Sequence, residues 1–440
     1  MSRKVYVIGA GLAGVEAVHQ LNKYGIDTVL YEMRPSVMTE AHKTNLFAEL
    51  VCSNSFKSYE PGSIDALLKH EMQMLDSIIL KFAYKHKTPA GKALAVDRSL
   101  FSKDITDHVQ SLEHVHVIRE EIKKIPDDEI IIIATGPLTS NALAQDIKTL
   151  IGNDMLHFYD AISPIIITDS IDLSMVWFGS RYQENRDYIN CPMTEQQYKD
   201  FVNLILRARS VEPEAFEDVK YFEGCLPVEV MAKRGTDVLK HGPMKPFGLI
   251  MPDGKSPYAV VQLRRENKQG TLYNIVGFQT KLKYSEQMRV FRMIPGLEHA
   301  EFARYGSIHR NSFINAPIVL DRFLRVRNKP SVFIAGQLAG VEGYMESSAA
   351  GIFAGINASR IIRGLEPFAM PEHTAMGALI NYITDPAHQP FQPMNINFGL
   401  FTDINGLKKD EKRIFIIKRA QSYIHNLVND VMIAPVKSYF

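Results

Sequence analysis

The stretch VYVIGAGLAG, residues 5–14, joins a short apolar, β-branched run to three glycines with the spacing GxGxxG. Apolar residues then recur at helical spacing as far as Leu21, so the pattern predicts a strand, a tight turn and a helix. In such a unit Gly9 permits the turn, Gly11 lets the backbone approach a pyrophosphate, and Gly14 lets the helix pack closely on the sheet. The phosphate would lie on the unpaired amides at the start of the helix. The stretch therefore predicts a dinucleotide-binding unit.

A second apolar strand, residues 28–31, ends at Glu32, about 20 residues beyond the glycines, as this fingerprint requires. The carboxylate of Glu32 is placed to accept hydrogen bonds from a ribose. The motif by itself leaves open whether FAD or a nicotinamide dinucleotide is bound. The cofactor-binding residues predicted in this unit are Gly9, Ala10, Gly11, Leu12, Ala13, Gly14 and Glu32.

Two later apolar runs, residues 129–134 and 331–335, each end in a glycine turn, and an Ala- and Gly-rich helix is predicted over 347–360. Because ligands of open α/β sheets gather at the carboxyl ends of parallel strands, these turns favour FAD as a resident cofactor. We predict one nucleotide-binding domain completed by distant segments, with a second independent α/β unit as the alternative. The turns add four predicted cofactor-binding residues: Gly136, Gly336, Gln337 and Gly340.

The chain has 440 residues, of which 46% are apolar and 22% charged, as is typical of a folded globular protein with two or three domains. The character changes after Cys191, where a helix is predicted to start at Thr194 and β-like segments follow. We therefore predict an α/β fold with an α+β insertion. The predicted division is a nucleotide-binding domain over residues 1–189 and 311–440, interrupted by the insertion at 190–310.

The three cysteines, Cys52, Cys191 and Cys225, are too few and too widely spaced for a disulfide framework, a CxxC redox pair or a zinc knuckle. This favours a reducing cytoplasm, and we predict no metal site. No run of 18 apolar residues occurs, so we predict no membrane span. Cys225 lies between Gly and Pro near several cations, which favour the nucleophilic thiolate, whereas Cys191 is interpreted as structural.

The formal net charge is only +1, but the charge is unevenly distributed. Residues 220–330 contain 19 Lys and Arg against 9 Asp and Glu, so the rest of the chain is acidic. Basic residues such as Arg304 alternate here with aromatic ones such as Phe302 and Tyr305. Cations for phosphates and aromatic faces for unstacked bases are typical of an RNA-binding surface. A solvated basic face over buried aromatic residues is the alternative.

Several longer sequence blocks, which follow one another along nearly the whole chain, resemble those of a known protein family. They include FAELVCSNS (47–55), FEGCLPVEVMAKRG (222–235), GQLAGVEGYMES (336–347) and FQPMNINFGLF (391–401). With these blocks the chain resembles the TrmFO family of folate- and FAD-dependent tRNA (uracil-5-)-methyltransferases, which is related to the GidA-like flavoproteins. The resemblance implies a Rossmann-like FAD-binding domain of the glutathione-reductase type with an insertion domain.

The resemblance also implies an activity, the methylation of C5 of uridine 54 in the T-loop of tRNA. The carbon would come from 5,10-methylenetetrahydrofolate, and the reducing equivalents from NADH or NADPH through bound FAD. By family analogy Cys225 is the nucleophile that adds to C6 of the uracil, and Cys52 assists removal of the C5 proton or the final elimination. Some similar proteins methylate a uridine of 23S ribosomal RNA instead. That activity and a small-molecule flavin oxidoreductase are the alternatives.

Overall fold

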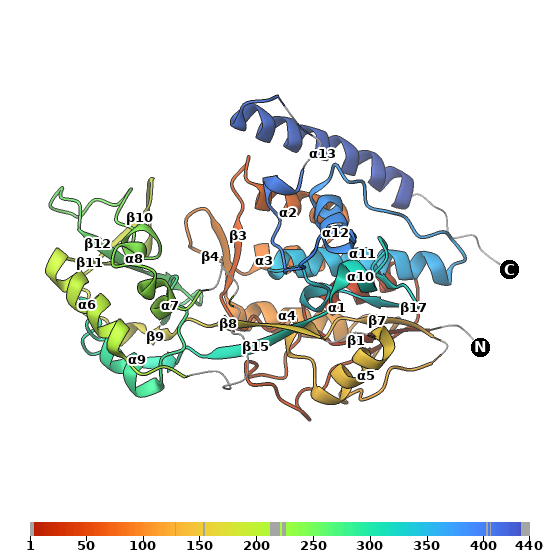
Figure 1. Cartoon of the computed structure of the whole chain (residues 1–440), viewed down its shortest axis with the longest axis horizontal. Coiled ribbons are helices and arrows are strands. Elements are labelled where there is room, and N and C mark those ends of the chain that lie inside the picture. The colour runs from red at the N-terminus through yellow and green to blue at the C-terminus, as the bar shows by residue number, and fades with distance from the viewer. Residues whose placement is uncertain are drawn as a thin grey trace.

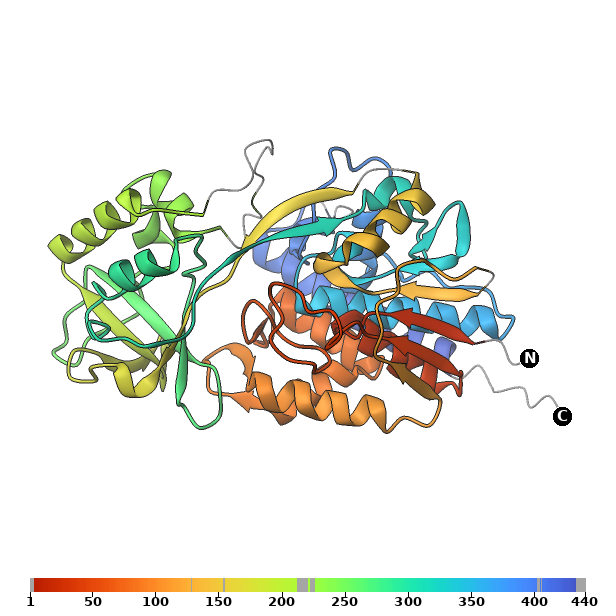
Figure 2. The same ribbon diagram turned by 90° about the horizontal axis from the view of Figure 1, so that it is seen from below.

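The computed structural model describes residues 4–127, 129–152, 155–211, 221, 226–401, 404 and 406–432. Within these residues the chain forms two units, each with its own sheet and its own apolar core (Figure 1). Two long paired strands, β8 (Leu156–Ala161) and β15 (Ile308–Phe313), run between the units (Figure 2). None of the described helices combines the length and the apolarity that a membrane crossing needs.

The first unit is built on a six-stranded sheet whose strands are parallel except for one edge strand. Its central strands are buried β-branched runs, as expected for a parallel sheet covered on both faces. In spatial order the strands are β16 (Arg325–Val326), β17 (Lys329–Ile334), β7 (Ile130–Ile133), β1 (Val5–Ile8), β2 (Thr28–Tyr31) and β6 (Val115–Ile118).

Helix α11 (Tyr344–Ile362) packs tightly on α1 (Leu12–Lys23) through small residues. A Cβ atom at Gly351 would lie 2.1 Å from the backbone oxygen of Ala13, so only glycine allows this approach. The strand that precedes α11, β17, pairs with β7 in the same sheet as β1. The segment around Gly336 thus shares one sheet with the N-terminal glycine turn, as expected for one domain completed by distant segments; the assignment of that domain to nucleotide binding stays a prediction.

Further α-helices and a small second sheet of the first unit surround this sheet, and α13 lies across the outside of α2 (Figure 1). They are the helices α2 (Ile64–Met74), α3 (Ile78–Lys85), α4 (Arg98–Gln110), α5 (Asn141–Ile151), α10 (Ala316–Val319), α12 (Ala375–Thr384) and α13 (Lys409–Met432), and the small antiparallel sheet of β3 (Ser55–Ser58), β5 (Ala93–Val96) and β4 (Lys87–Thr88).

The second unit is an antiparallel sheet with helices packed against it. The strands in spatial order are β10 (Trp177–Ser180), β11 (Gln183–Met193), β12 (Ala259–Arg265), β13 (Leu272–Ile275), β9 (Ile165–Ile167) and β14 (Phe302–Arg304), and the helices are α6 (Glu195–Arg207), α7 (Val228–Lys233), α8 (Val238–His241) and α9 (Tyr284–Phe291). Helix α6 starts after Thr194, whose side chain accepts a hydrogen bond from Gln197, as predicted for its N-terminus.

The strands β9 and β10 pair within the second sheet although they precede residue 190. The chain crosses between the units at β8 and returns at β15, where the amide of Ile162 donates to the carbonyl of Ser307 at 2.8 Å. The predicted division at residues 190 and 310 stays a prediction. We propose earlier boundaries for the insertion, near Ile162 and Ser307, because the second sheet and its core lie between these residues.

Candidate functional site

The three glycines of the GxGxxG motif have different surroundings. Gly9 has a φ of +99°, and a Cβ atom there would lie 2.7 Å from the backbone oxygen of Ala134. A Cβ atom at Gly14 would lie 1.8 Å from the backbone oxygen of Gly9. At Gly11, directly before α1, the nearest protein atom would be 3.9 Å away. Packing therefore requires Gly9 and Gly14, whereas the backbone at Gly11 faces open space at the helix N-terminus, where a pyrophosphate can bind.

Glu32 follows β2 and is buried beside this turn. Its carboxylate accepts a hydrogen bond from the amide of Ala10 at 3.1 Å and three from Arg34, of which the Nε contact is 2.8 Å long. Burial raises the pKa of Glu32, but the hydrogen bonds and the charge of Arg34 outweigh it and hold the pKa below its usual value. Sequence reasoning missed Arg34, although a cation two residues after the acid was the available signal.

We expect Glu32→Gln to lower the melting temperature of the cofactor-free protein near neutral pH and to lower it less in acid. Because the pKa of Glu32 is lower in the folded than in the unfolded protein, its contribution is present above about pH 4.5 and is lost as the pH falls through the lowered pKa. Hydrogen bonds to a charged group contribute about 1.5–3 kcal/mol. Melting curves of both proteins between about pH 3 and about pH 7 measure this effect. An equal difference at every pH would contradict it.

The other predicted cofactor-binding residues outside the GxGxxG turn follow the ends of β7 and β17. Gly136 opens the short helix η1 (Gly136–Leu138) after β7 with a φ of +68°. A Cβ atom at Gly336 would lie 3.0 Å from the Cβ of Ala13, and Leu12 begins α1 beside it. Gly340 has a packing reason to be glycine, since a Cβ there would lie 2.4 Å from the ring of Phe391. Their roles in binding a cofactor stay predictions.

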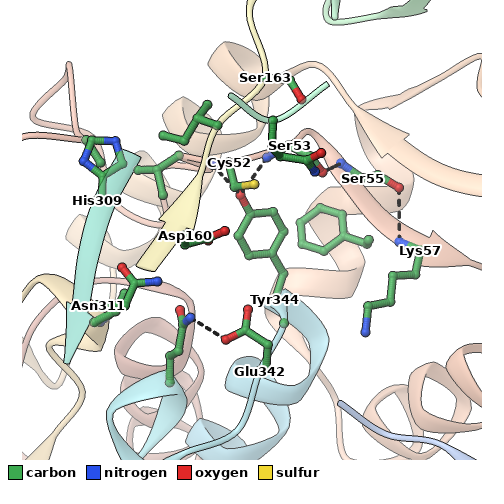
Figure 3. Close-up of a pocket in the computed structure, with 18 of the residues that line it drawn as sticks. Cys52, Ser53, Ser55, Lys57, Asp160, Ser163, His309, Asn311, Glu342 and Tyr344 are labelled. Carbon is green, nitrogen blue, oxygen red and sulfur yellow. Dashed lines mark hydrogen bonds between the residues drawn. The ribbon is translucent and has the colours of Figure 1, made fainter. Parts of the chain in front are cut away.

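A cavity of about 390 Å³ lies between the two units, next to a smaller cavity of about 70 Å³ at the glycine turn. Gly9, Gly11 and Glu32 line the small cavity, and Leu138 lines both. The large cavity receives side chains from both units and from the strands that join them. Figure 3 shows Cys52, Lys57, Asp160, His309, Glu342 and Tyr344 around it. Two adjoining cavities can hold the two ends of an elongated ligand.

Cys52 and Tyr344 meet at the wall of the large cavity (Figure 3). The hydroxyl oxygen of Tyr344 accepts hydrogen bonds from the amide of Cys52 at 2.9 Å and from the amide of Ser53 at 3.2 Å. Burial raises the pKa of this hydroxyl, which keeps Tyr344 neutral. The Cys52 thiol lies 3.9 Å from the carbonyl oxygen of Ala161. Tyr344 thus fixes the backbone that carries the predicted catalytic thiol, a role that sequence reasoning did not assign.

Arg98 also supports the backbone of the loop that contains Cys52. Its guanidinium donates to the carbonyl of Leu50 at 2.7 Å and to that of Cys52 at 3.2 Å. It also donates to both carboxylate oxygens of Glu266 in the second unit, at 2.6 and 3.1 Å. A partly buried guanidinium that donates to both oxygens of one carboxylate has a well-defined geometry. Arg98 therefore holds the Cys52 loop and links it to the second unit.

Carboxyl and amide groups also line the large cavity. Gln337 donates to the carboxyl group of Glu342 at 2.6 Å, and Asn395 donates to the backbone carbonyl of Glu342 at 2.6 Å. Burial and the charge of nearby Asp160 raise the pKa of Glu342 well above its usual value. Carboxyl groups, amide groups and a cation such as Lys57 together provide both donors and acceptors. This lining suits the polar edge of a heteroaromatic ring.

Of the other two cysteines, the structure describes only Cys191. Cys191 lies in β11 and is fully buried in the core of the second unit, where burial raises the pKa of its thiol, consistent with the structural role predicted for it. Cys225 lies outside the described residues. The catalytic roles of Cys52 and Cys225 stay predictions.

Comparison with known proteins identifies the family. A family model described as glucose inhibited division protein A matches residues 4–366. A Desulforudis audaxviator protein named methylenetetrahydrofolate–tRNA-(uracil-5-)-methyltransferase TrmFO is 54% identical over 410 residues, which are 92% of this chain and 93% of the relative. An Aquifex aeolicus protein of the same name is 50% identical over 439 residues, 99% of this chain and 98% of the relative.

The fold has a solved counterpart. The structure of Aquifex aeolicus GidA superimposes with a TM-score of 0.73 at 17% sequence identity, over 100% of this chain and 77% of that one. This confirms the predicted fold class, a Rossmann-like α/β domain with an insertion. Together with the extensive identity to the two named relatives, it shows that the chain belongs, as its sequence predicted, to the glucose inhibited division protein A family and, within it, to the TrmFO proteins.

Proposed function

We propose that this chain methylates C5 of a uridine in tRNA, most specifically uridine 54 of the T-loop. The carbon comes from 5,10-methylenetetrahydrofolate, and the reducing equivalents come from NADH or NADPH through bound FAD. The names of relatives about half identical over nearly the whole chain support the reaction. The structural observation that supports it is the position of Cys52 in a cavity that adjoins the glycine turn. The cytoplasm, where tRNA is modified, is the proposed location.

The residues around the two cavities fit FAD. Gly11 leaves open space at the start of α1 for a pyrophosphate, and Glu32 lies beside it for the ribose. Leu138 borders both cavities, so one extended molecule can occupy them together. Gln337 and Asn395 line the large cavity with amide groups that can hold the polar edge of the flavin ring. When bound, FAD supplies the redox chemistry of the reaction.

The chain supplies thiols for the chemistry of the uracil ring. In the proposed mechanism the thiolate of Cys225 adds to C6, and the electron pair of the C5–C6 double bond moves towards the C4 carbonyl to give an enolate. C5 then attacks the methylene carbon of the one-carbon carrier, and loss of the C5 proton with cleavage of the bond between that carbon and the carrier nitrogen leaves an exocyclic methylene group on C5. A hydride, whose electrons would come from NADH or NADPH through bound FAD, adds to this carbon as the Cys225 thiolate leaves C6, which gives the methyl group and restores the C5–C6 double bond. Cys52 assists the proton removal or the elimination, because its thiol lines the cavity and Tyr344 and Arg98 hold its backbone.

The decisive experiment uses the purified full chain with unmodified tRNA and, separately, with 23S ribosomal RNA. Each RNA is incubated with methylenetetrahydrofolate and NADH, and any 5-methyluridine is mapped. We expect a flavin absorption spectrum and methylation at position 54 of the tRNA. Product in the ribosomal RNA alone would overturn the assignment of the substrate. NADH oxidation by a small acceptor without any RNA product would favour a small-molecule oxidoreductase.

A further inference from the structure

A wide groove borders the cavity of Cys52 on the side of the second unit. Its volume is about 800 Å³, and His309 lines both the groove and the cavity. Four cationic side chains line the groove, and Glu40 is the acidic residue among the lining side chains that the structure describes. The four cations are Lys43, Lys281, Lys283 and Arg304. The groove is therefore positively charged and continuous with the proposed active site.

An aromatic stack ends in this groove. The rings of Phe302 and Tyr305 lie 5.2 Å apart with 15° between their planes, and those of Tyr305 and Tyr284 lie 4.9 Å apart at 24°. At its inner end Phe302 contacts Phe291, which is fully buried in the second core. At its outer end Tyr284 is 60% exposed. The stack is thus anchored in the fold and presents an aromatic side chain to the solvent.

Arg304 lines the groove and lies near the Cys52 loop. Within the described parts of the chain, its guanidinium has no hydrogen-bond acceptor and no carboxylate within ion-pair distance, although it lies near enough to Cys52 and Tyr344 to interact electrostatically with them. Glu40 lies instead near His309, with 3.7 Å between a carboxylate oxygen and Nδ1. Glu49 also interacts electrostatically with Arg304, but a half-buried cation that makes no hydrogen bond or ion pair with the described residues is suited to an anionic ligand such as a phosphate.

We propose that this groove binds the unpaired RNA nucleotides next to the target uridine, with Tyr284 stacking on one of their bases. The proposal rests on the RNA methylation proposed above and adds the position of the RNA. A base inserted into an active site must leave its own stack, and its neighbours then need new stacking partners. Exposed aromatic faces combined with cations that follow the backbone provide these partners in single-strand binding sites. The positive charge of the groove favours a polyanionic ligand, such as a loop of RNA, as its occupant.

The test uses a T-arm hairpin with the fluorescent base 2-aminopurine next to the target uridine, and the FAD-loaded full chain. Because stacking quenches this fluorophore, we expect quenching with the wild type and with Tyr284→Phe, and little quenching with Tyr284→Ala. Base stacking on an aromatic residue is worth 1–3 kcal/mol, so Tyr284→Ala should weaken binding about 5- to 150-fold. Tyr84→Ala, which truncates an exposed tyrosine outside the groove, is the matched control.

The salt dependence of binding provides a second measurement. Replacing Arg304 or Lys283 with alanine should reduce the slope of log affinity against log salt by about one for each lost phosphate contact. Unchanged affinity and quenching in Tyr284→Ala, with methylation by the wild type intact, would overturn the groove assignment alone. If the wild type methylates no RNA, the proposed function itself fails. Flavin content and melting temperature of each variant show whether it has folded.

Discussion

Replacing Cys52 with alanine will lower the rate of uridine methylation by about 10²- to 10⁴-fold, the usual effect of removing a group that transfers protons in catalysis. Cys52 lines the large cavity, and its backbone is held by Tyr344 and Arg98 without any contribution from its side chain. The variant should therefore fold normally and retain its flavin. Single-turnover methylation of tRNA measures the rate, and the visible spectrum measures the flavin.

Cys191→Ala is the matched control for this result. It removes the other thiol that the structure describes, which is buried in the core of the second unit and does not line the cavity. We expect a small loss of stability and methylation close to the wild-type rate. Wild-type activity of Cys52→Ala would exclude the proposed role of its thiol, and equal losses in both variants would indicate a general effect of losing a thiol.

Gly14→Ala is expected to remove flavin binding and to destabilise the first unit. The new Cβ would lie 1.8 Å from the backbone oxygen of Gly9, and neither backbone can move without separating α1 from the sheet. Overpacking of this kind costs about 3 kcal/mol. Because the same displacement moves the amides at the start of α1, the anion site is lost with it. The melting temperature of the cofactor-free protein and its flavin content after purification are the measurements.

Gly11→Ala separates cofactor binding from folding. Its Cβ would have no protein atom nearer than 3.9 Å, and its backbone conformation suits any residue, so the cofactor-free protein should melt near the wild-type temperature. The methyl group would project into the space proposed for the pyrophosphate, and we expect FAD affinity to fall about tenfold or more, which corresponds to about 1.4 kcal/mol. Wild-type FAD affinity in Gly11→Ala would contradict the proposed position of the pyrophosphate.

The first unit could be predicted from the sequence because its signals are local. A buried β-branched run, a glycine turn and a helix lie next to one another in residues 5–21, and the same order recurs around Gly336. The strands β8 and β15 were not predicted, because their pairing joins segments about 150 residues apart and neither segment has a distinctive period. The boundary of the insertion was hard to place for the same reason.

The candidate site was also only partly predictable, because some of its residues lie in recognisable sequence blocks and others come from distant parts of the chain. Glu32 was named from a short motif, and Cys52 from the family resemblance of the block that contains it. The groups that hold Cys52 come from distant positions: Tyr344 lies 292 residues away in the chain and Arg98 lies 46 residues away. Gly340 shows a second reason why the site was only partly predictable. The ring of Phe391 leaves no room for a side chain at Gly340, and in the sequence such a glycine looks the same as one that a ligand requires.

The paired strands β8 and β15 determine how a movement of the second unit would affect the large cavity. In the described parts of the chain, β8 and β15 form one antiparallel ribbon between the units, in which Asp160 lies opposite His309, and both residues line the large cavity. A rotation of the second unit would twist the ribbon and displace these two side chains, and it would also act on the Cys52 loop through the contact of Arg98 with Glu266. Binding of a large ligand to the second unit would therefore also shift groups that line the large cavity, which couples contacts on a remote surface of the protein to the geometry of that cavity.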